Sequence, residues 1–164
     1  MRSLSFFIAG IIVGAILLQP GSAQDSSIEP RPDRALNHIG IVVDDYDAAY
    51  AFYTRTLGLK EAYTVERDVG PLLTYLQLDR ETFVELIPAR GDQTTGVTHF
   101  GMEVADIDAF VQRLRSQGVE VADPGVTPAN ARFVRIRDTD NVEIEVMEFG
   151  PEASQYKAMQ AWRD

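Results

Sequence analysis

Four side chains in this sequence have the chemistry and the setting to bind a divalent metal. The chain contains only two histidines, His38 and His99, and both lie in segments rich in apolar and β-branched residues. Glu85 lies in a nearly all-apolar segment, where a buried carboxylate needs a partner, and Glu145 lies in a segment in which glutamates alternate with apolar residues. Imidazole and carboxylate donors together suit Zn, Ni, Co, Mn or Fe(II) better than calcium. Because the chain has no cysteine, thiolate sites, disulfides and a nucleophilic thiol are excluded.

An internal repeat places these residues in register with one another. At shifts of 60 or 61 residues, the chain aligns with itself in four informative pairs: His38 with His99, Gly40 with Gly101, Asp45 with Asp106, and Glu85 with Glu145. A single histidine on a strand is more often a core residue, and Glu145 alone also fits a solvent-facing position. Since the repeat aligns both histidines and both glutamates, we interpret His38, Glu85, His99 and Glu145 as one ligand set.

Each half of the repeat predicts the same order of elements, βαβββ. Apolar and β-branched segments predict the strands, and Asp-rich starts followed by amphipathic stretches predict the helices. The predicted strands are 36–43, 61–67, 72–78, 82–88, 97–104, 119–122, 132–137 and 142–149, and the predicted helices are 47–56 and 108–117. Gly58 and Gly118 are expected to end these helices. The sequence thus predicts an α+β fold, with modules 36–89 and 97–149 closing as a U-shaped mixed sheet and residues 150–164 forming a C-terminal helix.

The N-terminus has the pattern of a secretory signal peptide. Arg2 precedes an apolar run at 4–18, and Gly21 and Ala23 supply the small residues of a cleavage site, which predicts cleavage after residue 23. An uncleaved membrane anchor is the alternative, although the run is shorter than the roughly 20 residues of a span. Residues 24–35 are expected to form a flexible lead-in, and the domain is expected to be secreted or periplasmic.

The charge balance argues against nucleic acid as a partner. The formal net charge is −10, and no basic cluster offsets it. An acidic surface repels phosphate backbones and anionic lipid headgroups. We therefore expect a small-molecule substrate, with no nucleic-acid partner and no stable membrane insertion after cleavage.

The repeat and its flanking motifs resemble the vicinal oxygen chelate superfamily, the glyoxalase, bleomycin-resistance and dioxygenase group. The resemblance is carried by the histidine on each first strand, by the segment 52–59 and by Asp-Thr-Asp-Asn-Val-Glu-Ile-Glu at 138–145, and it covers about 36–149. The usual turn, Asp-Pro-Asp-Gly-Asn, differs here at Thr139 and Asn141. Asparagine tolerates the left-handed backbone, so we expect the turn to form. The resemblance also implies a homodimer, with the ligand set either within one chain or shared between two.

The resemblance also implies a choice among reactions. Dioxygenases and fosfomycin-inactivating transferases of this kind use His, His and Glu, methylmalonyl-CoA epimerases tend to have Gln at the position of Glu85, and glyoxalase I types have Glu there. The complete set favours an isomerase or lyase in which a carboxylate, Glu145 first and Glu85 second, removes a proton beside a metal-polarised carbonyl. The alternatives are an Fe(II) extradiol-type dioxygenase and a non-catalytic binding or resistance protein. Export argues against cytosolic glutathione and coenzyme A as substrate components.

Five further residues are candidates for binding the substrate. Arg135 precedes the 138–141 turn and is a candidate anchor for an anionic group, with an ordinary surface arginine as the alternative. The candidate pocket walls are Tyr75, Gln77, Phe83 and Met147, for which burial in the core is the alternative.

Overall fold

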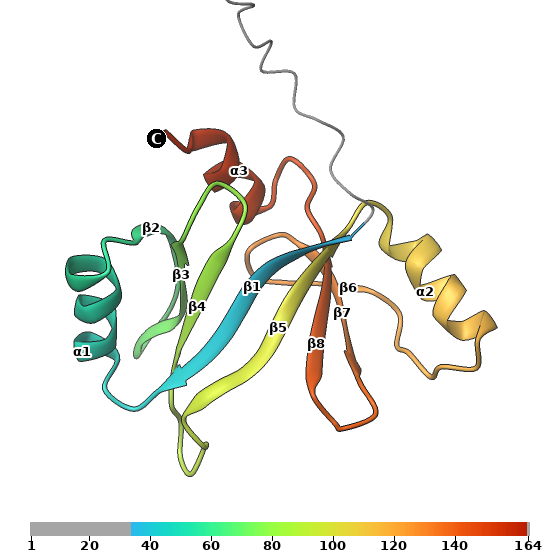
Figure 1. The fold of residues 1–164 in the computed structure, drawn as a ribbon, viewed down its shortest axis with the longest axis horizontal. Coiled ribbons are helices and arrows are strands. Elements are labelled where there is room, and N and C mark those ends of the chain that lie inside the picture. Colours follow the sequence, from blue (N-terminus) through green and yellow to red (C-terminus); the bar gives the residue numbers. More distant parts are fainter. Residues whose placement is uncertain (1–33, 164) are drawn as a thin grey trace, which may run out of the picture. The chain divides into compact units, whose positions relative to one another are not determined.

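Residues 34–163, which the computed structural model describes, form one curved mixed sheet with helices at its two ends (Figure 1). The eight strands follow the order β2-β3-β4-β1-β5-β8-β7-β6. Their bounds are β1 (Arg34–Val43), β2 (Lys60–Arg67), β3 (Gly70–Gln77), β4 (Phe83–Pro88), β5 (Gly96–Val104), β6 (Gly125–Val126), β7 (Arg132–Arg137) and β8 (Glu143–Glu148). The helical segments are α1 (Tyr46–Ala51), its π-helical continuation (Phe52–Thr56), α2 (Ile107–Ser116) and α3 (Ser154–Ala161). The α+β fold with a C-terminal helix is therefore confirmed.

The strand order repeats the duplication seen in the sequence. In each half the first strand pairs in parallel with the last, β1 with β4 and β5 with β8. The two first strands then pair with each other in antiparallel fashion and join the halves into one sheet. Because side chains alternate along a strand, His38 and Gly40 lie on one face of β1, and His99 and Gly101 lie on the same face of β5. Equivalent positions of the two modules thus meet at the centre of the sheet.

Local signals explain where the helices begin and end. The side chains of Asp45 and Asp106 accept hydrogen bonds from backbone N–H groups three residues later, at 2.9 and 2.8 Å, and so cap α1 and α2. Gly58 and Gly118 follow with φ of 77° and 81°, a left-handed conformation that glycine adopts without strain. Asn141 has φ of 67° in the β7–β8 turn, so asparagine takes the left-handed position as expected.

The strand expected at 119–122 does not form, and the two-residue β6 is the outer strand of this half instead. The Arg115 side chain donates to the backbone carbonyl of Val121 at 2.9 Å and to Asp123 at 2.8 Å, which holds the segment against α2. Pro124 then interrupts the chain before β6, and proline cannot donate to a strand ladder. The contacts of Arg115 with this segment therefore outweigh the apolar residues that had predicted a strand at 119–122.

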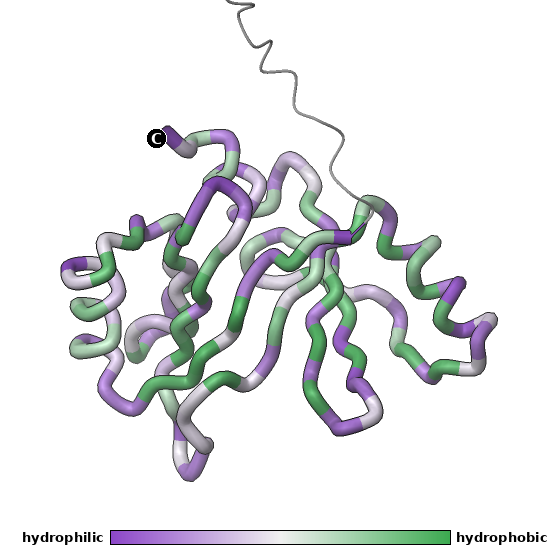
Figure 2. The backbone as a smooth tube through the Cα atoms, viewed as in Figure 1, coloured by the Kyte–Doolittle hydropathy of each residue, from purple (hydrophilic) through white to green (hydrophobic). Residues whose placement is uncertain are grey.

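Two apolar clusters hold the helices against the sheet. Under α2, Ile107, Phe110 and Val111 pack with Val134 and Val146. At the other end, Met159 of α3 packs with Tyr75 and Phe83, so α3 covers one end of the concave face. Figure 2 shows hydrophobic residues along the central strands and hydrophilic residues in the hairpin loops.

The structure describes no helix long and apolar enough to cross a membrane within residues 34–163. The predicted signal peptide at 1–23 and nearly all of the lead-in at 24–35 lie outside the described residues.

Candidate metal centre

The candidate ligands lie in two neighbouring rows that run across the sheet. In one row Glu85 of β4 pairs with Gly40 of β1, and Gly40 pairs with His99 of β5. In the next row His38 of β1 pairs with Gly101 of β5, and Gly101 pairs with Glu145 of β8. Each row thus contributes one histidine and one glutamate, with a glycine between them. The strand pairing gathers side chains that are up to 107 residues apart in the sequence.

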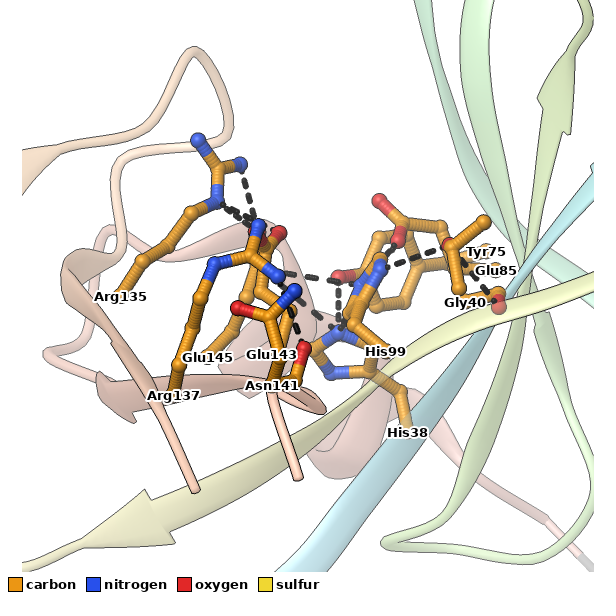
Figure 3. Close-up of polar contacts among 11 residues, drawn as sticks. His38, Gly40, Tyr75, Glu85, His99, Arg135, Arg137, Asn141, Glu143 and Glu145 are labelled. Atoms are coloured by element: carbon orange, nitrogen blue, oxygen red, sulfur yellow. Dashed lines mark hydrogen bonds and ion pairs between the residues drawn. The ribbon is translucent and has the colours of Figure 1, made fainter. Parts of the chain in front are cut away.

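The donor atoms of His38, His99 and Glu145 gather at one place, and Glu85 lies beside His99 (Figure 3). His38 Nε2 lies 3.2 Å from His99 Nε2, and Glu85 Oε2 lies 3.0 Å from His99 Nε2. Glu145 Oε2 lies 3.7 Å from His38 Nε2 and 3.9 Å from His99 Nε2. Donor atoms of His38, His99 and Glu145 all lie within 4.8 Å of one another. All four residues are buried and all belong to a single chain.

Two polar neighbours orient the histidine rings. Asn37 Nδ2 donates to the Glu81 carbonyl at 3.1 Å, which leaves Asn37 Oδ1 to accept from His38 Nδ1–H at 3.1 Å. Thr98 Oγ1 donates to the Gly40 carbonyl at 3.3 Å and accepts from His99 Nδ1–H at 3.1 Å. With each proton on Nδ1, both Nε2 atoms carry a lone pair, which is the form of imidazole that ligates metals.

The four side chains fit a divalent cation. In this tautomer the two Nε2 lone pairs face each other across 3.2 Å with no proton between them, an arrangement that a cation stabilises. Glu85 Oε2 is buried and makes no hydrogen bond of acceptable geometry with a described residue, although it lies close to His99. A buried carboxylate oxygen without a donor is costly unless it is neutralised. His38, His99 and Glu145 would hold the metal, and Glu85 Oε2 would lie beside it.

The glycines of the two rows supply the space that the histidine rings occupy. A Cβ atom on Gly40 would lie 2.0 Å from His99 Cε1, and a Cβ on Gly101 would lie 1.9 Å from His38 Cε1. Real Cβ atoms do not approach other heavy atoms so closely, so each module accommodates the histidine of the other. The repeat aligned these glycines, and the structure reveals the steric reason.

Arginine pairing distinguishes the two carboxylates. Arg135 donates from Nε and Nη2 to Glu145 Oε1 at 2.8 and 2.5 Å and lies 3.4 Å from Glu143. Burial by itself raises the pKa of Glu145, but in the metal-free protein, with both imidazoles protonated, hydrogen bonding by His38 and the charges of His99 and Arg135 lower that pKa to about 2. Glu85 has no such partner among the described arginines and lysines.

Acid should therefore destabilise the metal-free protein through Glu145. A carboxylate whose folded pKa is about 2, below the unfolded value of about 4.3, stabilises the fold above the unfolded pKa and loses that contribution as pH falls toward 2. Arg135→Leu removes one cause of the lowered pKa, so the decline in unfolding free energy between pH ~5 and ~2 should become shallower. Urea denaturation of the metal-free protein across this range measures the slope. An unchanged slope in the variant would contradict this assignment.

A cavity of about 380 Å³ opens onto the donor atoms. Glu85, His99 and Glu145 line it, whereas His38 lies behind them and is fully buried. Of the predicted substrate-binding residues, three line the cavity: Tyr75, Arg135 and Met147.

Gln77 and Phe83 do not line this cavity. Gln77 lies on the same face of β3 as Tyr75, but near the end that α3 covers, and its amide nitrogen donates to the Arg80 carbonyl at 3.3 Å. Phe83 is 1% exposed and packs between Tyr75 and Met159. The apolar pattern alone could not distinguish the open part of the face from the part under the helix.

Several residues at the site were missed by the sequence reasoning. Asn37 and Thr98 precede the two histidines and occupy aligned positions of the repeat, so the shift of 61 residues was a signal that could have found them. Tyr63 on β2 and Gln155 on α3 also line the cavity. No local pattern brings these two side chains together, because α3 packs against β2 only in the folded chain.

Comparison with known proteins agrees with this architecture. The sequence profile of the Glyoxalase/Bleomycin resistance protein/Dioxygenase superfamily matches residues 35–146. The chain belongs to this superfamily. The uncharacterized protein YaeR of Escherichia coli (strain K12) is 32% identical over 124 residues, which cover 70% of this chain and 96% of that protein. A probable chloroplastic lactoylglutathione lyase of Arabidopsis thaliana is 29% identical over 72% of this chain, but this match spans only 37% of the plant protein.

Solved structures of the superfamily share the fold. The methylmalonyl-CoA epimerase of Mycobacterium tuberculosis superposes with a TM-score of 0.62 at 27% identity, covering 71% of this chain and 89% of the epimerase. The resemblance to the vicinal oxygen chelate superfamily, first seen in the repeat and the 138–145 motif, is thereby confirmed.

Proposed function

We propose that this chain is a divalent-metal-dependent enzyme of glyoxalase type, an isomerase or lyase that transfers a proton at a carbon beside a carbonyl of a small oxygenated substrate. The observation that carries the proposal is the contrast between the two carboxylates. Glu145 is held by Arg135, whereas Glu85 lines the cavity with Oε2 buried beside His99 Nε2, and it has no arginine or lysine partner among the described residues. One carboxylate is suited to hold a cation and the other to accept a proton.

We propose the opposite order of the two carboxylates from the one expected from the sequence, with Glu85 as the base. A divalent cation held by His38, His99 and Glu145 would supply Lewis-acid polarisation of a carbonyl, which would lower the pKa of the adjacent C–H. Glu85 Oε2 then accepts the proton as the C–H bond breaks, the electron pair moves into the carbonyl, and Glu85 returns the proton at another carbon or face. Arg135 keeps Glu145 ionised and in place, and the largely apolar wall, with Leu73, Ile87 and Phe133, excludes water.

Two of the relatives are named as an epimerase and a lyase, and proton transfer at carbon serves both kinds of reaction. Export, proposed from residues 1–23, favours a substrate other than an adduct of cytosolic glutathione or coenzyme A. A homodimer remains a prediction. Each chain contains both histidines and both glutamates in proximity, so the proposal does not need a shared site.

Metal binding is the first test of the proposal. Metal-free protein should take up about one equivalent of Zn or Co, and at 100 times the dissociation constant the bound ion should add about 2.7 kcal/mol to the unfolding free energy. For a domain of this size that corresponds to a rise in Tm of roughly 10 °C, reversible with a chelator. Calorimetry with metal analysis of the purified domain measures both quantities. Absence of a bound ion after reconstitution would overturn the proposal.

A second candidate is an Fe(II) dioxygenase, which the grouping of His38, His99 and Glu145 favours. Two histidines and one carboxylate on one face form the site of non-haem Fe(II) oxygenases. Oxygen consumption by the Fe(II)-loaded protein with catechols would support this candidate. Proton exchange without oxygen uptake would support the isomerase or lyase.

A further inference from the structure

Two polar atoms in the cavity wall have no hydrogen-bond partner of acceptable geometry among the described residues, although Tyr75 interacts with both side chains. They are the Tyr63 hydroxyl oxygen on β2 and Gln155 Oε1 in the first turn of α3, and both are buried. Both residues line the cavity onto which Glu85, His99 and Glu145 open. Buried polar atoms without partners are rare in folded proteins and cost free energy, so a pair of them in one cavity points to a ligand.

The pair lies next to the candidate metal centre. The Tyr63 ring stacks on the Tyr75 ring with centroids 4.9 Å apart and an interplanar angle of 13°. The Tyr75 hydroxyl in turn lies 3.3 Å from His38 Nε2. One aromatic ring therefore separates Tyr63 from the histidines, and Tyr63 and Gln155 line the same cavity as Glu85, His99 and Glu145.

The chemistry of the two atoms restricts the group that can satisfy both. A phenol hydroxyl donates a hydrogen bond, whereas an amide oxygen only accepts one. A carbonyl oxygen would leave Gln155 Oε1 unsatisfied, and an ammonium group would leave the Tyr63 hydroxyl without an acceptor. A hydroxyl group accepts from Tyr63 and donates to Gln155.

An anion does not match these two atoms. Burial raises the pKa of the Tyr63 hydroxyl well above its ordinary value, so this hydroxyl keeps its proton and can donate. A carboxylate or phosphate of a ligand only accepts hydrogen bonds and would leave Gln155 Oε1 unsatisfied. An uncharged hydroxyl satisfies both atoms.

We propose that Tyr63 and Gln155 form a binding subsite for an uncharged hydroxyl group of the substrate. The inference rests on the proposed function and narrows it: the substrate class is small, neutral hydroxyketones that carry a second hydroxyl. The cavity of about 380 Å³ accommodates such a molecule with an apolar substituent against Leu73, Ile87 and Phe133.

A matched pair of probes tests the subsite. Hydroxyacetone offers one hydroxyl beside its carbonyl, and dihydroxyacetone adds a second hydroxyl without charge. Ligand-observed NMR titration gives both dissociation constants, with the full-length protein free of metal and loaded with zinc. We expect dihydroxyacetone to bind at least about fivefold more tightly than hydroxyacetone, the factor that one net hydrogen bond supplies.

Single substitutions assign the preference to the two side chains. Tyr63→Phe and Gln155→Met remove the polar atoms with little change in volume, and each should reduce the preference to less than about twofold while leaving hydroxyacetone binding unchanged. Tyr156→Phe, on the adjacent residue outside the cavity lining, is the matched control and should keep the preference. If Gln155→Met does not fold, Tyr63→Phe alone decides the question.

The outcomes separate this inference from the proposed function. Equal binding of both probes by the unmodified protein, or a preference that survives Tyr63→Phe, would overturn the subsite. Failure to retain zinc would overturn the proposed function, whereas the ratio of the two probes in the metal-free protein still tests Tyr63 and Gln155.

Discussion

Gly40→Ala should reduce the affinity for a divalent metal by more than about 100-fold while the protein stays folded. The new Cβ would lie 2.0 Å from His99 Cε1, so the ring must leave its position. His99 borders the cavity and has space into which it can rotate. Changes to groups that only support a ligand cost about 10–100-fold in metal affinity, and displacement of the ligand itself should cost more. Competition titration with a chromophoric chelator measures the affinity.

Gly101→Ala should have the same effect on metal binding and a larger effect on stability. Its Cβ would lie 1.9 Å from His38 Cε1, but His38 is fully buried and does not border the cavity. A ring that cannot move outward forces its surroundings to shift, and such overpacking typically costs about 1–3 kcal/mol. Urea denaturation of the metal-free variants should therefore rank Gly101→Ala below Gly40→Ala in unfolding free energy.

Gly150→Ala is the matched control for both variants. No atom lies within 4 Å of a Cβ at this position, and its backbone does not require glycine, so metal affinity should be unchanged. A double variant, Gly40→Ala with His99→Ala, distinguishes steric displacement from general disruption, because without the ring the alanine at position 40 should cost no further stability. Retention of full metal affinity by Gly40→Ala would contradict the steric argument.

Substitution of Glu85 and substitution of Glu145 should have different effects, the first on the rate of C–H exchange and the second on metal affinity. Glu85→Gln should retain the metal, because His38, His99 and Glu145 remain, but should lower the rate of C–H exchange by about 10²–10⁴-fold, the usual contribution of a general base. Glu145→Gln should instead lose metal affinity, because the carboxylate that Arg135 holds between both histidines is gone. Deuterium incorporation into hydroxyacetone, followed by NMR, measures the exchange, and calorimetry measures the metal.

Glu120→Gln, at an exposed position beyond α2, controls for the loss of one charge and should change neither quantity. If Glu85→Gln abolishes metal binding as completely as Glu145→Gln does, both carboxylates are essential ligands and Glu85 is not the base. If Glu145→Gln retains the metal but loses exchange, the order of the two carboxylates expected from the sequence is restored.

The repeat made much of this fold predictable. Because duplicated segments fold alike, aligning His38 with His99 and Glu85 with Glu145 predicted that the four side chains converge, and the structure brings them together. Helix caps and ends followed from residues whose local hydrogen bonding or backbone freedom decides them, such as Asp45 and Gly58. These signals act within a few residues and need no tertiary context.

Other features of the site depend on contacts that no local pattern encodes. Whether Phe83 lines the cavity or the core is decided by α3, which returns to the sheet from the far end of the chain. Tyr63 and Gln155 meet the same cavity only because α3 packs against β2. The absence of a strand at 119–122 likewise follows from the contact of Arg115 with Val121.

Residue types and the repeat therefore predicted which side chains could bind a metal and that two equivalent modules carry them. Residue type and repeat spacing are properties of the chain alone. Only the tertiary structure decided how the two carboxylates differ, because Arg135 approaches Glu145 from the neighbouring strand β7 and no equivalent arginine approaches Glu85 among the described residues. It also decided why glycine is required opposite each histidine, since that constraint exists only across the pairing of β1 with β5.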